Sequence, residues 1–358
     1  MTKCKLGDIC EIVSGSTPKT SIAEYWDGDV KWITPAELSD DTYIIMDSVR
    51  KITKLAVEKT GLRSIPKGTV ILSSRAPIGK VAIAGCELYC NQGFKNLICS
   101  DVINNKYLYW FLRGNTIFLN SLGRGATFKE ISKSIVSEIE INIPSIMQQK
   151  KVVENLEKLN RIISIRKQEL QLLDELVRGR FVELFGDIIS NEKGWETDIW
   201  SNVLKIVNGK NQKAVESEDG EYLICGSGGA MGRATEYLTN ENSVIIGRKG
   251  SINKPLLMRE KYWNVDTAFG IEPNTKYINV DYLYMFCVFF NFEKLNKAVT
   301  IPSLTKTDLL NIEMPIPNIL LQNQFADFVH QIDKSKFGHL SMLTTMKSAY
   351  DQQTFIYP

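Results

Sequence analysis

The stretch Val70-Ile-Leu-Ser-Ser-Arg-Ala-Pro-Ile-Gly-Lys80 decides the fold, because the chain contains it twice. Its second copy, Val244-Ile-Ile-Gly-Arg-Lys-Gly-Ser-Ile-Asn-Lys254, aligns with it without gaps. Four more pairs of matching segments occur in the same order: Ile12–Gly15 with Ile206–Gly209, Asn91–Phe94 with Asp266–Phe269, Tyr107–Tyr109 with Tyr282–Tyr284, and Ile139–Pro144 with Ile312–Pro317. Five ordered matches indicate an internal duplication, whereas chance similarity between apolar strands would not preserve order and spacing.

The offsets between these matches show where the two copies differ in length. From the Val70 segment onward, the offset in residue number stays almost constant through the remaining matches. The offset of the pair nearest the N-terminus, Ile12 with Ile206, is larger. The first copy therefore contains a stretch of extra sequence between its first two matching segments.

Each copy begins with a part that is typical of short strands and turns. Runs of β-branched residues, such as 67–74, 80–85 and 243–247, are broken by Gly, Pro and Asn. After Pro144 and Pro317 the composition changes, and between Ser145 and Phe185 the only helix-breaking residue is Gly179. With Ser145 as N-cap and Gly186 as a stop signal, this segment predicts one long helix.

The predicted helix carries a coiled-coil pattern. Its apolar stripe consists of Leu156, Ile163, Leu170, Val177 and Leu184 at seven-residue intervals, Val152, Leu159 and Leu173 between them, Arg166 and Arg180 as polar exceptions, and Ile162 and Leu176 at the edge. Such a stripe requires a partner helix along its length, which is roughly 60 Å for about 40 residues.

The second copy supplies that partner. Apolar residues recur at helical spacing after Pro317, at Phe325, Phe328, Val329, Ile332, Leu340, Leu343, Met346 and Tyr350. Gly338 weakens the middle of this helix by about 1 kcal/mol relative to alanine. Two antiparallel helices of this kind form an intramolecular coiled coil with a pseudo-twofold axis.

We therefore predict an α+β protein with two similar mixed α/β domains separated by two long antiparallel helices. The predicted domains are residues 1–144 and 191–318, and the predicted helical segments are residues 145–190 and 319–358.

Composition excludes several classes of protein. The chain has 358 residues, 44% of them hydrophobic, which excludes disorder as its main state. It has no apolar run long enough to span a membrane and no signal sequence at its charged start, so we expect a cytoplasmic protein without a membrane helix. Its seven cysteines do not indicate a disulfide framework. Cys86 and Cys90 are either ordinary small buried residues, which we favour, or members of a metal site.

The sequence also lacks linear motifs of catalysis. It has no Asn-Pro-Pro-aromatic methyltransferase motif, no P-loop, no Pro-Asp nuclease motif and no Gly-x-Ser-x-Gly. Gly226-Ser-Gly-Gly229 lacks the spacing of a phosphate-binding loop and is typical of a turn. We therefore expect no catalytic residues and no metal or other cofactor in this chain.

Charge alone gives weak support for nucleic-acid binding. Residues 1–144 carry 18 Lys and Arg against 15 Asp and Glu, whereas residues 191–318 carry 14 against 16. A protein that binds DNA alone is usually more basic, but one that shares DNA with basic partners need not be.

Matching polar loops in the two copies are the candidate binding sites. Ser, Thr, Asn, Lys and Arg bond phosphates and base edges, although each loop could equally be a solvated turn. Arg75, Arg124 and Arg248 are the strongest single candidates. The full set of candidate DNA-binding residues is Ser16, Thr17, Lys19, Ser74, Arg75, Lys80, Arg124, Thr127, Lys129, Lys133, Lys210, Asn211, Lys213, Arg233, Arg248, Lys249, Lys254, Thr300, Ser303 and Lys306.

Several segments together resemble a known family over the whole chain. They are Gly15-Ser-Thr-Pro18, Tyr25-Trp-Asp-Gly28, Trp32-Ile-Thr-Pro35 with Leu38, Val70–Val81, Asn91-Gln-Gly-Phe94, Ile141-Asn-Ile-Pro144 followed by Gln148-Gln149, and Leu170–Phe181. With the repeat, they make the chain similar to the specificity subunit of a type I restriction–modification system.

The resemblance implies a division of labour. Two target-recognition domains would each read one half of a bipartite site in double-stranded DNA, and the two helices would set the spacer and dock methyltransferase subunits. Two modification subunits and the restriction subunits would supply catalysis, so S-adenosylmethionine, Mg²⁺ and ATP would belong to those partners.

Two interpretations from other classes remain open at this point. A coiled-coil adaptor with two protein-binding heads predicts apolar patches in place of polar loops. An enzyme with an unrecognised site predicts activity of the isolated chain.

Overall fold

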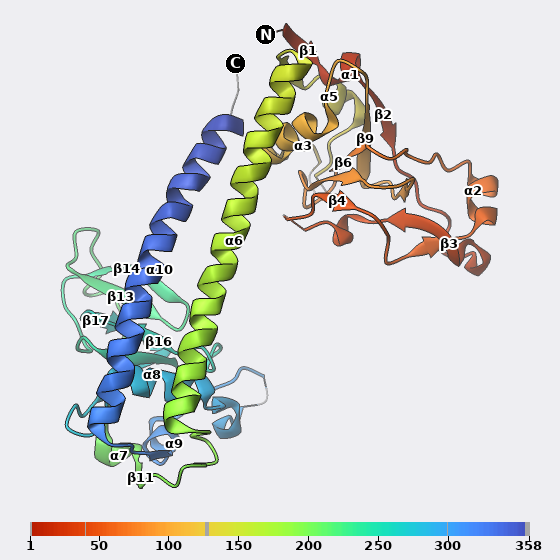
Figure 1. The fold of residues 1–358 in the computed structure, drawn as a ribbon. Coiled ribbons are helices and arrows are strands. Elements are labelled where there is room, and N and C mark those ends of the chain that lie inside the picture. The colour runs from red at the N-terminus through yellow and green to blue at the C-terminus, as the bar shows by residue number, and fades with distance from the viewer. Residues whose placement is uncertain (1, 40, 126–128, 299, 355–358) are drawn as a thin grey trace. The chain divides into compact units, whose positions relative to one another are not determined.

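The computed structural model describes residues 2–39, 41–125, 129–298 and 300–354, with the side chains of the last helix described as far as Met346. The chain divides into two compact units, residues 1–166 with 341–358, and residues 167–340. In chain order, each mixed α/β part is followed by one long helix, labelled α6 and α10 in Figure 1.

The main sheet of the first unit has five strands in the order β2-β9-β6-β7-β4, antiparallel except for the pair β7 and β4. Helix α3 (Asn105–Gly114) packs on β6 and β7. A smaller sheet has the order β5-β3-β8, and its central strand carries the buried Trp32. The strands are β2 (Cys10–Ser14), β3 (Trp26–Ile33), β4 (Ile44–Ile45), β5 (Lys51–Ile52), β6 (Val70–Ser73), β7 (Val81–Ala84), β8 (Tyr89–Cys90) and β9 (Phe94–Cys99).

The second unit repeats this plan with a four-stranded sheet, β12-β18-β15-β16, and a smaller sheet, β14-β13-β17. Helix α8 (Val280–Phe289) packs on the larger sheet as α3 does in the first unit. The strands are β12 (Leu204–Asn208), β13 (Tyr222–Gly226), β14 (Gly229–Ala234), β15 (Ser243–Gly247), β16 (Leu256–Met258), β17 (Tyr262–Asn264) and β18 (Ala268–Pro273).

Short elements complete each unit, and the first unit has more of them. An antiparallel strand pair closes each one, β1 with β10 and β11 with β19. The remaining elements are β1 (Thr2–Lys5), α1 (Leu6–Ile9), η1 (Ala23–Tyr25), η2 (Pro35–Glu37), α2 (Lys54–Thr60), α4 (Thr116–Ser121), α5 (Lys133–Ser137), β10 (Glu140–Ile143), β11 (Thr197–Ile199), α7 (Trp200–Val203), η3 (Phe292–Leu295), α9 (Lys306–Leu310) and β19 (Glu313–Pro315).

Two buried glutamines confirm the internal repeat at the level of single hydrogen bonds. Gln149 and Gln322 occupy equivalent places in the two copies and have no exposed surface. Each side chain donates to two backbone carbonyls and accepts one backbone N–H over 2.7–3.0 Å. The partners are Val102, Pro144 and Asn104 for Gln149, and Tyr277, Pro317 and Asn279 for Gln322. Both copies thus use one device to join the long helix to its domain.

The sheet register corrects one of the predicted matches. Ser73 lies opposite Phe94 in the first ladder, and Gly247 lies opposite Ala268 in the second. Phe94 therefore corresponds to Ala268, which directly precedes the Phe269 that sequence matching paired with it. Similar side chains in neighbouring positions produced the wrong match, because letters alone do not fix a strand's register.

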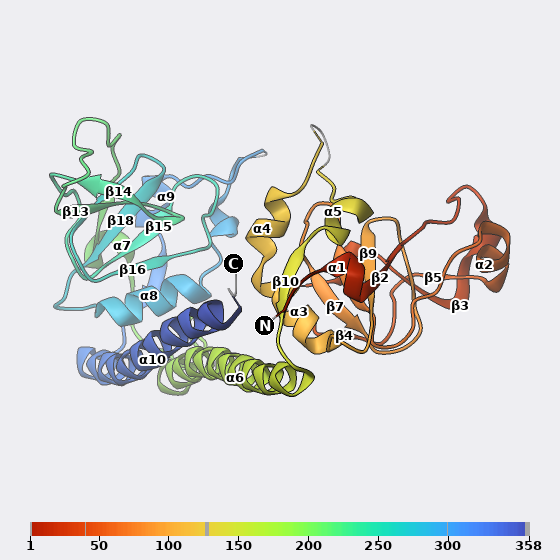
Figure 2. The same ribbon diagram turned by 90° about the horizontal axis from the view of Figure 1, so that it is seen from above.

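The long helices are α6 (Ile146–Phe185) and α10 (Ile319–Thr354). Within the second unit they run antiparallel, as predicted: Phe325 contacts Phe181 edge to face, whereas further along α10 the Lys336 ammonium lies 2.6 Å from Asp174. Figures 1 and 2 show α10 alongside this half of α6. Helix α10 continues through Gly338, so the expected local weakening does not interrupt it.

The predicted stripe of α6 is buried or half-buried, with two errors at its edge. Ile162 and Leu176, expected to widen the stripe, are 40% and 50% exposed. Val153, Phe181 and Phe185 are buried instead, because the stripe widens toward the domain core against which the helix also packs.

The stripe of α10 differs from prediction at one turn. Leu340 is 52% exposed, and the half-buried positions there belong to Lys336 and His339. These two polar residues pair with Asp174 and Glu169 of α6, so hydrophilic contacts replace the expected leucine. Tyr350, also predicted for this stripe, lies outside the described side chains.

Candidate nucleic-acid interface

The polar loops singled out by the sequence gather at one end of each main sheet. In the first unit, β2 and β6 end where β9 and β7 begin, because neighbouring strands are antiparallel. We define the first loop surface as residues 15–20, 74–80, 91–93 and 122–130, and the second loop surface as residues 209–213, 248–254, 265–267 and 296–305. Residues 126–128 and 299 of these ranges are outside the described residues.

Backbone hydrogen bonds tie the segments of the first loop surface together. The Ser16 amide donates to the Cys90 carbonyl over 2.8 Å. The Ser74 amide donates to the Gly93 carbonyl over 2.7 Å, and the Ser74 carbonyl accepts the Ile131 amide over 2.9 Å. Four segments separated in sequence therefore form one braced surface.

The second loop surface repeats these bonds one for one. The Lys210 amide donates to the Asn264 carbonyl over 3.0 Å, and the Arg248 amide to the Thr267 carbonyl over 2.8 Å. The Arg248 carbonyl accepts the Leu304 amide over 2.9 Å. Arg248 thus occupies the position of Ser74, and the two surfaces share a backbone framework that carries different side chains.

A glycine at the same place in both surfaces makes this framework possible. A Cβ atom on Gly15 would lie 1.8 Å from the Asn91 carbonyl oxygen, and one on Gly209 would lie 1.8 Å from that of Val265. Both distances are far below van der Waals contact, so only glycine permits the close approach of these strands' connecting loops.

Cationic side chains dominate both surfaces. The first contains Lys19, Arg75, Lys80, Arg124 and Lys129, with Glu130 as its single acid. The second contains Lys210, Lys213, Arg248, Lys249, Lys254 and Lys297, with Asp266 as its single acid. This local excess is hidden in the counts for whole domains, because acids lie elsewhere on them. It matches what a phosphate backbone attracts.

The single acid of the first surface joins two cations. Glu130 accepts the Arg75 Nε at 2.9 Å with one oxygen and the Lys95 Nζ at 3.2 Å with the other. Burial opposes ionisation of Glu130, but the hydrogen bonds from Arg75 and Lys95 outweigh it and hold the pKa of this carboxyl below its ordinary value. Glu130 is therefore ionised at neutral pH, and the three side chains form a network.

The candidates of the first unit divide into exposed and structural groups. Thr17 is half-buried and donates to the Gln92 side chain. Ser74 is fully buried, and the half-buried Lys80 donates to the Leu38 carbonyl, so both hold the loop. Thr127 lies outside the described residues. The exposed candidates are Ser16, Lys19, Arg75, Arg124, Lys129 and Lys133.

In the second unit, two candidates serve the backbone. Lys306 donates to the Ile206 carbonyl over 2.8 Å, and Arg233 donates to the carbonyls of Gly220 and Glu221 from strand β14, outside the second loop surface. The others on this surface are Lys210, Asn211, Lys213, Arg248, Lys249, Lys254 and Thr300, all exposed, and the half-buried Ser303.

Sequence reasoning missed Lys95 and Glu130. Lys95 lies in strand β9, which is otherwise mostly buried, and its side chain is only 7% exposed. A lysine inside such a strand is a signal, since a buried ammonium requires a partner. Arg50 was also missed; its guanidinium lies 4.1 Å from the Trp26 ring on the smaller sheet.

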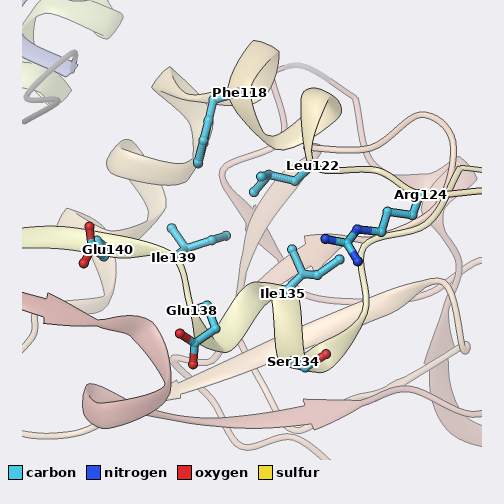
Figure 3. Close-up of a pocket in the computed structure, with 8 residues that line it drawn as sticks. All are labelled: Phe118, Leu122, Arg124, Ser134, Ile135, Glu138, Ile139 and Glu140. Atoms are coloured by element: carbon cyan, nitrogen blue, oxygen red, sulfur yellow. The ribbon is translucent and has the colours of Figure 1, made fainter.

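A hollow of about 600 Å³ adjoins Arg124 (Figure 3). Its apolar lining consists of Phe118, Leu122, Ile135 and Ile139. The two acids at its rim are paired with cations: Glu138 with Lys5 at 2.6 Å and Glu140 with Lys3 at 2.7 Å. The hollow therefore differs in chemistry from the cationic surface beside it.

The described part of the chain does not gather ligands for a metal ion. Within it, no three His, Cys, Asp or Glu side chains come close enough together to hold one. Cys86 donates to the Met46 carbonyl, and Cys90 is buried. No described helix is both long and apolar enough to cross a membrane.

Comparison with known proteins gives a consistent family. The family model for the type I restriction modification DNA specificity domain matches residues 1–175 and 192–339. The chain is 30% identical over 390 residues to the MjaIX type I restriction enzyme specificity subunit of Methanocaldococcus jannaschii, covering 97% of this chain and 90% of that relative. It is 27% identical over 191 residues to the EcoR124I/EcoR124II specificity subunit of Escherichia coli, covering 51% and 46%.

Solved structures agree on the fold. The S subunit of a type I restriction–modification system from M. genitalium superposes with a TM-score of 0.60 at 16% identity, covering 99% of this chain and 94% of that one. A chain from a study of assembly and conformational transition in the type I system gives 0.62 at 15% identity, covering 99% and 96%. Since the family model also matches both copies of the repeat, this chain belongs to the family of type I restriction–modification DNA specificity subunits.

Proposed function

We propose that this chain is the non-catalytic DNA-reading subunit of a type I restriction–modification complex. Each loop surface reads one half of a bipartite site in double-stranded DNA. The observation that carries this proposal is the pair of loop surfaces with one hydrogen-bonded framework and different side chains, Ser74 in one and Arg248 in the other. A shared frame with varied side chains is what two readers of different bases require.

Charge and exposure support the choice of DNA as ligand. Among the charged residues of the two loop surfaces, lysine and arginine far outnumber acids, and Arg75, Arg124 and Arg248 are exposed. Arginine pairs with guanine edges and with phosphates, whereas lysine supplies point charges for phosphates. An adaptor with protein-binding heads would require apolar loops, whereas the exposed candidates of these loops are polar or charged.

The proposal assigns catalysis to partners. Two modification subunits and the restriction subunits would bring S-adenosylmethionine, Mg²⁺ and ATP. Exposed apolar residues on α6, among them Ile165, Leu172 and Leu176, support a role of this helix in docking the modification subunits.

Methylation mapping tests the two-reader proposal. We expect no methylation or cleavage by the purified chain, and adenine methylation of a bipartite site once modification subunits and S-adenosylmethionine are added. Exchanging residues 1–144 for the equivalent domain of a relative is expected to change one half of the methylated sequence. A change in both halves, or methyl transfer by the chain without partners, would contradict the proposal.

A second experiment tests the helices as a spacer. Four residues inserted near Glu169 lengthen α6 by about one turn, or ~6 Å, which is nearly two base pairs at ~3.4 Å each. An active variant is expected to recognise the same half-sites across a longer spacer. An unchanged spacer would show that the helices only tether the two domains.

A further inference from the structure

The contacts of Glu130 suggest a role for a residue that need not touch DNA. Its carboxylate binds the Arg75 Nε at 2.9 Å and the Lys95 Nζ at 3.2 Å. Its backbone forms antiparallel bridges with both Arg75 and Arg124. Lys95 is buried and also donates to the Ser74 hydroxyl over 3.3 Å. The backbone bridges and the contact with Lys95 thus fix the position of the Glu130 carboxylate beside Arg75.

We propose that Glu130 is a positioning residue that orients Arg75 to read a guanine in the half-site of the first unit. This inference rests on the proposed function. The Arg75 side chain is 46% exposed, and among the described residues its two Nη groups have no recorded side-chain partner. A guanidinium fixed through Nε keeps these two parallel donors for a base, and a guanine presents O6 and N7 as matching acceptors.

The physical gain is preorganisation. A free arginine side chain loses rotamer entropy when it is fixed on a base. Contact with Glu130 fixes part of that freedom before binding, because the antiparallel bridge already sets the two backbones side by side. Lys95 neutralises the second oxygen of Glu130, so the carboxylate does not repel the DNA as a free charge would.

The second unit has other residues at the positions of this network, so the Glu130–Arg75 contact belongs to the first unit. The bridge between Arg75 and Glu130 is matched there by a bridge between Lys249 and Ser303. Arg248 corresponds to Ser74, and Phe269 corresponds to Lys95. In place of the Ser74–Lys95 hydrogen bond, the guanidinium carbon of Arg248 lies 5.9 Å from the centre of the Phe269 ring. The same framework therefore holds an arginine by a carboxylate in one unit and beside an aromatic ring in the other.

The test is Glu130→Gln in the full chain assembled with its modification subunits. After the wild-type site is mapped by methylation sequencing, binding is measured to that duplex, to duplexes altered at each G·C pair of the first half-site, and to a random duplex. We expect discrimination at one G·C pair to fall about tenfold. Affinity for the random duplex is expected to rise several-fold with a steeper salt dependence, since Arg75 and Lys95 are then no longer compensated by a carboxylate.

These opposite changes separate positioning from support of the fold. A merely structural role would lower specific and random affinity together. Arg75→Lys provides a second variant, because lysine keeps the positive charge but lacks the two parallel N–H donors of the guanidinium. It is expected to lose discrimination at the same base pair with nearly unchanged random affinity, and the double variant is expected to lose no more than either single one.

The matched control is Glu11→Gln. Glu11 also pairs with an arginine, Arg63 at 2.7 Å, but it lies on strand β2 outside the first loop surface. We expect no change in the half-site.

If Arg75→Ala changes the first half-site but Glu130→Gln leaves discrimination intact, the positioning role is overturned and the proposed function stands. If Arg75→Ala changes neither base preference nor affinity, Arg75 does not read DNA and both proposals fail for this loop.

Discussion

The two units contact their long helices at equivalent positions, but the acid of the contact lies on the helix in one unit and on the domain in the other. In the first unit, Lys106 of α3 lies 2.8 Å from Glu157 of α6. In the second, the acid is on the domain: Asp281 of α8 lies 3.6 Å from His330 of α10 and 2.5 Å from Arg259. The positions correspond, since the offsets from Lys106 to Asp281 and from Glu157 to His330 are those of the internal repeat.

This difference shows what a duplicated fold preserves. The backbone framework is retained through Gln149 and Gln322, whose bonds are the same in both units. The two side chains of the helix contact, by contrast, change together. One consequence is that α6 packed on the second domain would bring Glu157 against Asp281. Like charges so placed repel each other, which disfavours the first turns of α6 in the place that the first turns of α10 occupy on the second domain.

The largest expected effect comes from alanine at the two glycines where the backbones of the loops approach most closely. Gly15→Ala and Gly209→Ala each place a Cβ inside a backbone carbonyl contact. We expect each to destabilise its unit by about 3 kcal/mol or more, because backbone must move. Urea unfolding followed by hydrogen exchange measures this unit by unit. If one alanine is tolerated and the other is not, the two loop frameworks are less alike than their hydrogen bonds suggest.

The buried glutamines give a smaller shared effect. Gln149→Ala and Gln322→Ala each leave three backbone groups without a partner in a buried place, which costs about 2–4 kcal/mol. Similar losses in the two variants, measured by chemical denaturation, are expected from the identical bonding. Gln148→Ala is the control, since its side chain bonds only locally with the exposed Ser145.

The sequence was sufficient for the elements whose signal is periodic. The heptad of α6 and the antiparallel partner in α10 follow from spacing, because helical side chains share a face every three or four residues. The edge of the stripe did not follow from spacing: Ile162 is exposed and Phe181 buried, since the domain core decides which flank is covered.

The loop surfaces were predictable as segments and not as networks. Matching polar loops identified Arg75 as a candidate, but Ser74 beside it is buried because its amide and carbonyl bond Gly93 and Ile131. Lys95 and Glu130 are far apart in the sequence and meet only in the folded chain. A network that depends on tertiary contacts has no signature in one sequence.

A pH-dependent experiment sharpens the contrast between the two helix contacts. Burial opposes ionisation of Glu157, but hydrogen bonds from Lys106 and Tyr43 outweigh it and lower the pKa of this carboxyl. Because the folded pKa is depressed, the stabilisation is present above the unfolded value of about 4.3 and is lost as pH falls through the folded value.

Glu157→Gln is therefore expected to cost about 1–2 kcal/mol at pH 7 and little once the pH lies below the folded pKa of Glu157. Thermal unfolding of both forms from pH 7 to pH 3 measures the difference. At pH 7, His330→Gln is expected to cost less, because His330 is half exposed and Arg259 keeps Asp281 paired. A constant effect of Glu157→Gln at all pH values would show that its contacts are steric.

The smallest expected effects compare the two helices themselves. Gly179 of α6 and Gly338 of α10 are exposed and have open space where a Cβ would lie. Alanine at either position is expected to raise the free energy of unfolding by about 0.5–1 kcal/mol, mainly by restricting the unfolded chain.

The surroundings of the two glycines differ, and this is where the comparison can be sharpened. Gly179 lies between the buried Val177 and Phe181, whereas Gly338 lies between the polar seam residues Lys336 and His339. A polar seam provides less apolar burial to resist local opening. Gly338→Ala is therefore expected to slow amide exchange around residues 334–342 more than Gly179→Ala slows it around residues 175–183. Equal slowing in both helices would mean that the pair opens as one cooperative unit despite its polar seam.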